Sequence, residues 1–367
     1  MRIALDYQTF AQQTYGGISR YFTRLAENFI ICGEQVKIFA PLHVNAYLKS
    51  LTLDTISGRH IKRFPPKTKR FFLTYNRLTS SGKIKQWQPD VVHETYYSKY
   101  RTAPKKYPLV ITVYDMIHEM FDHEFPARDQ TAAIKKIAIA RADHVICISE
   151  NTKKDLVELH GISEDKISVV LLGFDQFTNH PKFQQPLETK PKPFLLYVGS
   201  RGGYKNFAGF LKSVAISKNL RSDFDVLAFG GGKFTPAELA YIANLGFSSN
   251  QVRQVSGDDS LLGHYYTTAR AFVYPSQYEG FGIPPLEAMA HRCPVVSSNT
   301  SSMPEVIGHA GEYFNPMNTT EMQHAIESVV YSDSRIAELR AMGTARLAHF
   351  SWATCAKQTL AVYRNLL

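Results

Sequence analysis

The sequence predicts an α/β fold made of two doubly wound parallel-sheet domains that face each other across a cleft. Its length of 367 residues exceeds the size at which one hydrophobic core stops growing. Short β-rich apolar runs alternate with helical patterns in both halves, which is typical of parallel sheets with right-handed crossovers. Between the halves lies the polar, proline-rich stretch QFTNHPKFQQPLETKPKP, which indicates a linker over residues 176–193.

The first half, residues 1–175, begins with the strand RIALD. A helix over 16–33 follows, because its apolar residues repeat with helical spacing at Ile18, Tyr21, Phe22, Leu25 and Phe29. Further strands are expected over 35–41, 90–97, 109–117, 144–149 and 166–175, each bounded by Gly, Pro or charge. Helices are expected over 129–142 and over 149–161, where Ser149 caps the start and Gly161 closes the end.

The second half, residues 194–348, repeats the alternation. Strands are expected at FLLYVGS, FDVLAFGGG, NQVRQVSG, ARAFVYPS and CPVVSS, with helical stretches between them. In parallel sheets of this kind, ligands bind beyond the carboxyl ends of the strands. Unusual residues at those ends are therefore the candidates for function.

Composition narrows the class of protein. With 44% hydrophobic and 20% charged residues the chain is not broadly disordered. It opens MRIALDYQTF, a strand-like run, so we expect no secretory signal. The four cysteines are far apart in the sequence, which favours reduced thiols in a cytosolic protein over disulfides or a zinc site.

The net charge of +10 is unevenly placed, since residues 45–110 carry fourteen Lys or Arg against three acids. The densest run, RHIKRFPPKTKRFF over 59–72, mixes basic residues with aromatics. One interpretation is a solvated loop face. The other is a surface for anionic membrane lipids or for a phosphate-bearing acceptor, where each basic residue near a bilayer contributes about 1 kcal/mol. Nucleic acid is disfavoured because no binding module is recognisable.

Candidate residues follow three strands of the first half. Gly16 and Gly17 open a helix whose amides suit an anion, although such a pair is commonly just a turn. Asp115 and His118 follow the strand in TVYDMIHEMF, and His93 lies at a strand end in VVHETYY. A lone histidine is more often structural, so the nearby carboxylate is what makes His118 a candidate.

In the second half, Arg201 and Lys205 flank a Gly-Gly turn after the first strand. Arg can bind a phosphate with two parallel bonds and Lys supplies a movable charge, whereas the plainer interpretation is an exposed basic loop. The loop FGGG over 229–232 lacks the G-x-G-x-x-G spacing of a dinucleotide site, which disfavours a dehydrogenase.

The stretch EGFGIPPLEA holds two glutamates, Glu279 and Glu287, around a Gly-Phe-Gly turn and a Pro-Pro pair. The prolines suit the start of a helix, with Glu287 in or near its first turn. Main-chain amides of residues 280–282 can then point into the cleft. An ordinary strand–turn–helix explains Glu287 but gives no reason for Glu279 or for the glycines.

EGFGIPPLEA resembles the E-x7-E signature of the retaining glycosyltransferases of family 4, whose GT-B fold has two Rossmann-like domains. The likeness extends through YGGISRY, VYDMIHE, VICISENTKKDL, VLLGFD, YVGSRGGYKN and FSWATCAKQTLAVYRNLL. It implies an acceptor-side domain over 1–175 and a nucleotide-sugar-binding domain over 194–348. It also implies that the last helix, over 349–367, crosses back onto the N-terminal domain, with Trp352 and Tyr363 at the junction.

The resemblance also assigns site residues. It implies that Arg201 and Lys205 hold the donor diphosphate, that Glu287 binds the ribose, and that Glu279 acts catalytically by holding the transferred hexose. The rest of the implied donor-binding set is Gly16, Gly17, Gly230, Val255, Ser256, Gly280, Phe281 and Gly282. Relatives often carry His-Asp where this chain has Tyr114-Asp115. We therefore expect Asp115 or His118 to orient the acceptor hydroxyl, with His93 also on the acceptor side.

The resemblance implies a retaining hexosyltransferase that needs neither cofactor nor metal. In agreement, the D-x-D motif Asp223–Asp225 precedes a strand, at the wrong sheet edge for a metal–nucleotide site. We expect UDP-hexose or GDP-mannose as donor and a glycan or lipid-linked oligosaccharide as acceptor, with the enzyme cytoplasmic and peripheral at the inner membrane face. The alternatives are a same-fold nucleotide-sugar epimerase or phosphorylase, and an inactive nucleotide-sugar-binding subunit.

Overall fold

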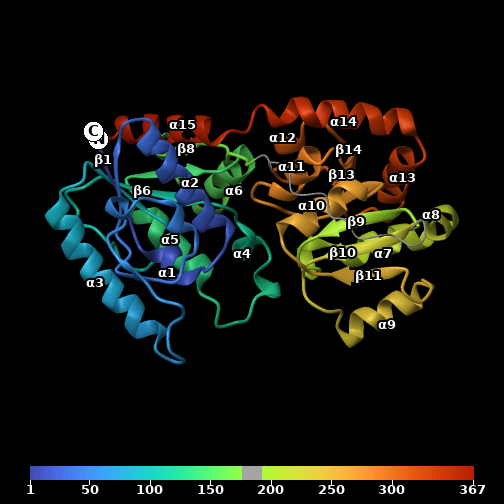
Figure 1. Ribbon diagram of the computed structural model, residues 1–367, viewed down its shortest axis with the longest axis horizontal. Coiled ribbons are helices and arrows are strands. Elements are labelled where there is room, and N and C mark those ends of the chain that lie inside the picture. The colour runs from blue at the N-terminus through green and yellow to red at the C-terminus, as the bar shows by residue number, and fades with distance from the viewer. Residues whose placement is uncertain (176–191) are drawn as a thin grey trace. The chain divides into compact units, whose positions relative to one another are not determined.

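The computed structural model (Figure 1) describes residues 1–175 and 192–367. The chain forms two compact units. Unit 1 consists of Met1–Gly173 and Phe350–Leu367, and unit 2 of Phe174–His349. The linker expected over 176–193 falls almost entirely on residues 176–191, which lie outside the described ranges.

Unit 1 is built on a sheet of six parallel strands in the order β2-β1-β5-β6-β7-β8. These strands are β1 (Arg2–Leu5), β2 (Gln35–Ile38), β5 (Val91–Glu94), β6 (Leu109–Val113), β7 (His144–Cys147) and β8 (Ile167–Val169). A separate small sheet pairs β3 (Leu42–His43) with β4 (Arg59–His60). The helices include α1 (Gln8–Gln12), α4 (Ile117–Met120), α5 (Thr131–Arg141) and α6 (Glu150–His160).

Helix α2 (Gly17–Ile31) buries the apolar face that its spacing predicts, with Tyr21, Phe22, Leu25 and Phe29 inside the core. The last helix, α15 (Trp352–Arg364), packs against α2 although more than three hundred residues separate them, as the red and blue ribbons of Figure 1 show. The rings of Phe29 and Tyr363 lie 5.7 Å apart. The final helix is thus part of the core of unit 1.

Helix α3 (Lys69–Trp87) is not predicted by the sequence pattern. Its buried side carries Asn76 and Ser80, which bond the main chain of Leu42 and Phe39, as well as Ile84. Three large apolar side chains lie instead on its exposed side: Phe71, Tyr75 and Leu78. Because the polar and apolar faces are reversed, hydrophobic periodicity does not reveal this helix.

Unit 2 is built on a second sheet of six parallel strands, in the order β11-β10-β9-β12-β13-β14. The strands are β9 (Phe194–Val198), β10 (Asp225–Phe229), β11 (Val252–Val255), β12 (Ala271–Tyr274), β13 (Val295–Ser298) and β14 (Gly311–Phe314). In chain order this is 3-2-1-4-5-6, so the topology switches direction between β9 and β12. A ligand is expected at such a switch point.

Helices connect the strands of unit 2: α7 (Phe207–Ile216), α8 (Lys218–Asp223), α9 (Pro236–Asn244), α10 (Asp259–Thr268), α11 (Ile283–Ala290), α12 (Met303–Ile307), α13 (Thr319–Val330) and α14 (Asp333–Leu347). Leu195, Phe210, Val226 and Ile326 are among the buried side chains that join strands and helices into one core. In residues 1–175 and 192–367, none of the helices has both the length and the apolar content needed to cross a bilayer.

Candidate active site

The switch point of unit 2 brings together two loops that are far apart in sequence. One loop follows β9 and contains Arg201 and Lys205; the other follows β12 and contains Glu279. The amide of Gln277 in the second loop donates to the carbonyl of Tyr204 in the first, at 2.7 Å. The loops are therefore joined through their main chains.

Lys205 and Glu279 form an ion pair across these loops. The ammonium of Lys205 donates to Oε1 of Glu279 at 2.6 Å, and the two side chains are only 20% and 10% exposed. A cation and an anion of low exposure thus lie side by side where the fold predicts a ligand. The roles predicted for Lys205 and Glu279, diphosphate and hexose binding, stay predictions.

The main chain of Glu279 is held on both sides by hydroxyl groups from the segment after β13. Its amide donates to Oγ of Ser301 at 2.9 Å, and its carbonyl accepts from the hydroxyls of Ser301 and Ser302 at 2.8 Å. Ser302 also donates to the carbonyl of Phe281 at 2.9 Å. Four hydrogen bonds therefore fix the course of the Glu279–Phe281 segment.

Two buried tyrosines, Tyr197 and Tyr274, interact electrostatically with Glu279. Burial raises the pKa of Tyr274 well above its ordinary value, and the adjacent Glu279 carboxylate raises it further. Burial also raises the pKa of Tyr197, with a further contribution from Glu279. The Tyr197 hydroxyl donates to the carbonyl of Ser200 in the loop after β9. Both phenols stay protonated and act as hydrogen-bond donors at neutral pH.

The Gly-Phe-Gly turn leads directly into α11. Gly282 has a φ of 105°, which disfavours any residue with a side chain, and a Cβ there would come within 2.8 Å of Cε of Met303. The two prolines lie in the first turn of the helix, as expected. Glu287 is the fifth residue of α11, beyond that first turn, and its Oε2 accepts from the buried Tyr266 hydroxyl at 3.2 Å.

Arg201 turns toward the loop between β10 and α9. Its guanidinium bonds Glu238 through Nε at 2.6 Å and Nη2 at 3.3 Å, and its side chain is 4% exposed. The same loop contains Gly230, whose amide donates to the carbonyl of Val255 at 2.8 Å. Gln254 joins the carbonyl of Gly230 to Oγ of Ser256. The role predicted for Arg201, diphosphate binding, stays a prediction.

In unit 1, Gly16 precedes α2 and Gly17 is its first residue. The side-chain oxygen of Gln13 already accepts the Ser19 amide of that first turn, at 3.1 Å. Asp115 follows β6, and its Oδ1 accepts the amide of Ile117, the first residue of α4, at 3.1 Å. These loops follow β1 and β6, at the edge of the sheet where sequence analysis placed them.

His118 lies on α4, and its ring stacks on Phe125 at a centroid distance of 4.1 Å. Beneath this segment lies Lys135, a residue that sequence analysis missed. Its buried ammonium donates to the Asp115 carbonyl and to Oε2 of Glu119, both at 2.7 Å. No sequence signal points to it, since it lies on α5, twenty residues from Asp115.

The placement of His93 corrects an expectation. We expected it on the acceptor side, but it is a fully buried residue inside β5. Its Nδ1 bonds the Tyr363 hydroxyl at 2.6 Å and its Nε2 bonds Oγ1 of Thr112 at 2.9 Å. Burial lowers its pKa to about 3. His93 therefore joins β5, β6 and α15 as a neutral core residue, and Tyr363 belongs to that core.

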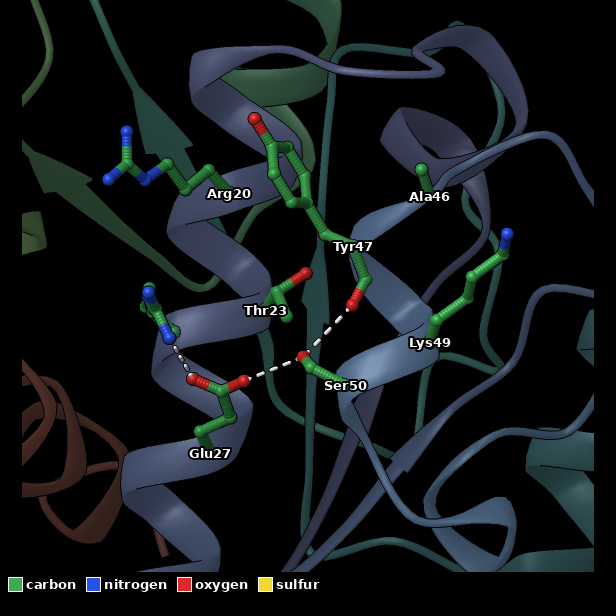
Figure 2. Close-up of a pocket in the computed structure, with 8 residues that line it drawn as sticks. Arg20, Thr23, Glu27, Ala46, Tyr47, Lys49 and Ser50 are labelled. Atoms are coloured by element: carbon green, nitrogen blue, oxygen red, sulfur yellow. Dashed lines mark hydrogen bonds and ion pairs between the residues drawn. The ribbon is translucent and has the colours of Figure 1, made fainter. Parts of the chain in front are cut away.

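Figure 2 shows a pocket of about 370 Å³ that sequence analysis also missed. Thr23, Glu27 and Ser50 face one another in it, while Arg20 and Lys49 extend to opposite sides. Ser50 donates to Oε1 of Glu27 at 2.8 Å. The α2 residues of this pocket form the polar face of that helix, so in sequence they look like an ordinary solvated surface.

The chain thus has two parallel-sheet α/β units, and unit 2 has a cation–carboxylate pair at its switch point, where open sheets of this kind bind ligands. Family models agree on a narrower class. Residues 15–176 match "Glycosyltransferase Family 4" and residues 179–345 match "Glycosyl transferases group 1". The chain belongs to glycosyltransferase family 4 and has the GT-B fold, as its sequence motifs predict.

Similar proteins agree with this assignment. The chain is 27% identical to O-antigen chain mannosyltransferase B of Escherichia coli, over 95% of this chain and 96% of the relative. It is 27% identical to the MMP alpha-(1->4)-mannosyltransferase of Mycolicibacterium hassiacum, over 82% and 76%. The match to the serotype-specific mannosyltransferase WbdA of E. coli, 30% identical over 62% of this chain, spans 29% of that longer protein.

Solved structures share the fold at lower identity. Sucrose-phosphate synthase of Thermosynechococcus elongatus has a TM-score of 0.74 at 18% identity, covering 100% of this chain and 98% of the other. Anabaena Alr3699/HepE, solved with UDP and glucose, has a TM-score of 0.69 at 17% identity, with 98% of both chains covered. These structures share the fold, and the family models make the protein a glycosyltransferase.

Proposed function

We propose that this protein is a retaining mannosyltransferase that moves mannose from a nucleotide-diphosphate sugar to a glycan or lipid-linked oligosaccharide during polysaccharide biosynthesis. GDP-mannose is the favoured donor and a UDP-hexose the alternative. The observation that carries the proposal is the Lys205–Glu279 pair at the switch point of unit 2. The names of two relatives, both mannosyltransferases, support the choice of sugar.

The chemistry needs a cation where the diphosphate leaves. As the bond from the anomeric carbon to the phosphate oxygen breaks, positive charge develops on the sugar and negative charge on the diphosphate. A fixed positive group beside the leaving oxygen stabilises this state without transferring a proton. In our proposal the Lys205 ammonium turns from Glu279 to the diphosphate.

Glu279 and Glu287 would then bind hydroxyl groups. Released from Lys205, the Glu279 carboxylate can accept from hydroxyls of the transferred hexose, together with the amides of Phe281 and Gly282. Glu287 can accept the ribose diol beside the Tyr266 hydroxyl that it already binds. The loop containing Val255 and Ser256 is proposed to border the base, with Gly230 beside it.

Side chains of unit 1 are proposed to bind and orient the acceptor. Asp115 and His118 are proposed to orient the attacking hydroxyl, whose oxygen forms the new bond to the anomeric carbon. Lys135 holds the main chain of Asp115 in place for this task. Replacing Asp115 with Asn and His118 with Ala should each slow transfer, and near wild-type turnover in both variants would exclude this role.

We propose no metal in the reaction. In the D-x-D motif, Asp223 ends α8 and Asp225 begins β10, where it pairs with Arg253 at 3.4 Å. Lys205 and Glu279 instead follow the carboxyl ends of β9 and β12. Titration with excess EDTA should leave transfer unchanged. Loss of activity that Mg²⁺ or Mn²⁺ restores would contradict this part of the proposal.

A peripheral contact with anionic membranes completes the proposal. Helix α3 presents Phe71, Tyr75 and Leu78 to solvent, with spacing i, i+4 and i+7 on one helical face. Residues 55–89 around them contain nine Lys or Arg and no Asp or Glu. An apolar stripe within a basic segment matches the chemistry of an anionic lipid surface. We therefore propose that the enzyme acts in the cytoplasm, bound peripherally to the inner face of a membrane.

A thermal-shift panel of UDP, GDP and ADP sugars tests the donor. A ligand present at one hundred times its Kd stabilises the native state by about 2.7 kcal/mol, so the true donor should stand out. Transfer is then assayed with that donor and mixed glycan acceptors. Isomerised sugar nucleotide without any acceptor would indicate an epimerase, and binding without turnover would indicate an inactive binding subunit.

A further inference from the structure

The guanidinium of Arg201 is fully engaged inside unit 2. An arginine has five N–H groups, and here each has an acceptor. Nε and Nη2 bond the two carboxylate oxygens of Glu238 at 2.6 and 3.3 Å. Nη1 bonds the carbonyls of Gly230 and Gly232 at 3.1 and 2.9 Å, and Nη2 bonds that of Lys233 at 3.1 Å. No further N–H group is left for a phosphate.

The loop that provides these carbonyls is shaped around the guanidinium. Gly230, Gly231 and Gly232 have φ values of 89°, 68° and 73°, a run of left-handed backbone that only glycine adopts easily. A Cβ on Gly231 would come within 2.6 Å of Nη1 of Arg201 and 2.9 Å of the Gly199 carbonyl. The structure thus explains why three glycines follow β10: they allow the main chain to wrap around the Arg201 guanidinium.

Glu238 ties this arrangement to helix α9. It forms a capping box with Thr235, accepting the Thr235 amide at 2.7 Å while Oγ1 of Thr235 accepts the Glu238 amide. Its pKa is lowered to about 2, mainly by the bond from Arg201, so it stays ionised. The ring of Phe234 covers the guanidinium at 4.7 Å. The pair therefore fixes the loop at both ends.

Lys205 differs from Arg201 in how easily it can change partner. It is a point charge on a flexible stem, and one bond holds it to Glu279. Freeing Arg201 would instead break five bonds, to the carboxylate of Glu238 and to the carbonyls of Gly230, Gly232 and Lys233. Of the two cations in this loop, Lys205 is the one that can move to a ligand.

We propose that Arg201 and Glu238 are positioning residues: together they hold the loop between β10 and α9 in the shape that receives the nucleotide, and Lys205 alone of the two cations meets the diphosphate. This rests on the proposed function for the identity of the ligand. The loop also contacts β11, through the bond from the Gly230 amide to Val255. A displacement of the loop between β10 and α9 would therefore also move Val255 and Ser256, the residues proposed to border the base.

Comparing nucleoside mono- and diphosphates distinguishes variants that weaken nucleoside binding from variants that weaken diphosphate binding. Affinities of UDP, GDP, UMP and GMP are measured by calorimetry for the wild type, Arg201→Lys, Glu238→Gln, the double variant and Lys205→Ala. Replacing a residue that binds the second phosphate changes the ratio of diphosphate to monophosphate affinity. Replacing a residue that only shapes the loop changes both affinities by the same factor and leaves the ratio unchanged. That ratio does not respond to a uniform loss of folding stability.

We expect Arg201→Lys and Glu238→Gln each to weaken mono- and diphosphate binding by the same factor, about tenfold. The double variant should be no weaker than the worse single one, because both changes break the same contact. Lys205→Ala should lower diphosphate affinity alone. As a matched control, Lys233→Gln removes an exposed cation from the same loop, leaves its carbonyl in place, and should change neither affinity.

Two results would overturn the proposal. One is a loss in Arg201→Lys confined to the diphosphates while Glu238→Gln binds normally, which would make Arg201 a phosphate ligand. The other is wild-type binding in both variants. If no nucleotide binds the wild type, the proposed function fails, but hydrogen exchange still tests the positioning: amides of 229–238 should exchange faster in Glu238→Gln, with those of β13 and β14 unchanged.

Discussion

Replacing Lys205 with Ala tests the centre of the proposed site, because it removes the cation and leaves the Glu279 carboxylate without its partner. Breaking a fully buried ion pair costs about 3–5 kcal/mol, and an exposed one contributes about 0–1 kcal/mol. With exposures of 20% and 10% this pair lies between those limits. We therefore expect Lys205→Ala to lower the free energy of unfolding by about 2 kcal/mol.

The effect on catalysis should be larger than the effect on stability. A preorganised group that stabilises developing negative charge typically contributes about 10²–10³ in kcat, or about 2.7–4 kcal/mol. With the donor saturating, kcat of Lys205→Ala should fall by that factor. The assay follows release of the nucleoside diphosphate at fixed acceptor, and urea unfolding of the same samples measures stability.

Controls distinguish this role from general destabilisation. Lys212→Ala removes an exposed cation from α7 and should change neither quantity. Adding Glu279→Gln to Lys205→Ala removes the uncompensated charge, so the double variant should be more stable than the sum of the single effects predicts. If Lys205→Ala keeps kcat within about threefold of the wild type, Lys205 does not stabilise the leaving group.

Three further outcomes are expected. Because His93 has a pKa of about 3 when folded and about 6.5 when unfolded, the unfolded chain binds the proton first, and stability is lost as pH falls below 6.5. The free energy of unfolding should drop by about 1.6 kcal/mol more between pH 6.5 and 5 in the wild type than in His93→Gln, measured in urea; equal slopes would contradict this. Gly282→Ala should cost about 1–3 kcal/mol and reduce turnover, whereas Gly202→Ala, at an ordinary φ with open space around it, should do neither in thermal melts and assays. Phe71→Ser with Leu78→Ser should reduce flotation with phosphatidylglycerol vesicles about tenfold, and equal flotation with phosphatidylcholine would reject a charge-selective membrane contact.

Strand alternation predicted much of the architecture. The carboxyl ends of parallel strands share one edge of the sheet, so residues after β9 and β12 were expected at that edge, and the structure adds that these two strands are neighbours. For that reason Lys205 and Glu279 could be placed in one site although 74 residues separate them. The helix start at the Pro-Pro pair was also predicted, whereas the left-handed φ of Gly282 comes from the structure.

The sequence could not predict side-chain contacts between residues that are far apart in the chain and follow no periodic pattern. Glu238 lies 37 residues from Arg201, and no spacing rule connects a helix cap to a loop cation. His93 looked available at a strand end, but its partner Tyr363 lies 270 residues away on the last helix. Helix α3 was not predicted, because Asn76 and Ser80 on its buried face bond the main chain where apolar groups would usually pack.

The two cations after β9 show why residue type in a motif does not settle its role. Arg201 and Lys205 are four residues apart, and the sequence suggested one task for both. A planar fork with five donors is best satisfied by several fixed acceptors, and the loop after β10 supplies them. An ammonium on a flexible stem can change its partner with little rearrangement. This difference is why the proposed function gives the diphosphate to Lys205 and a positioning role to Arg201.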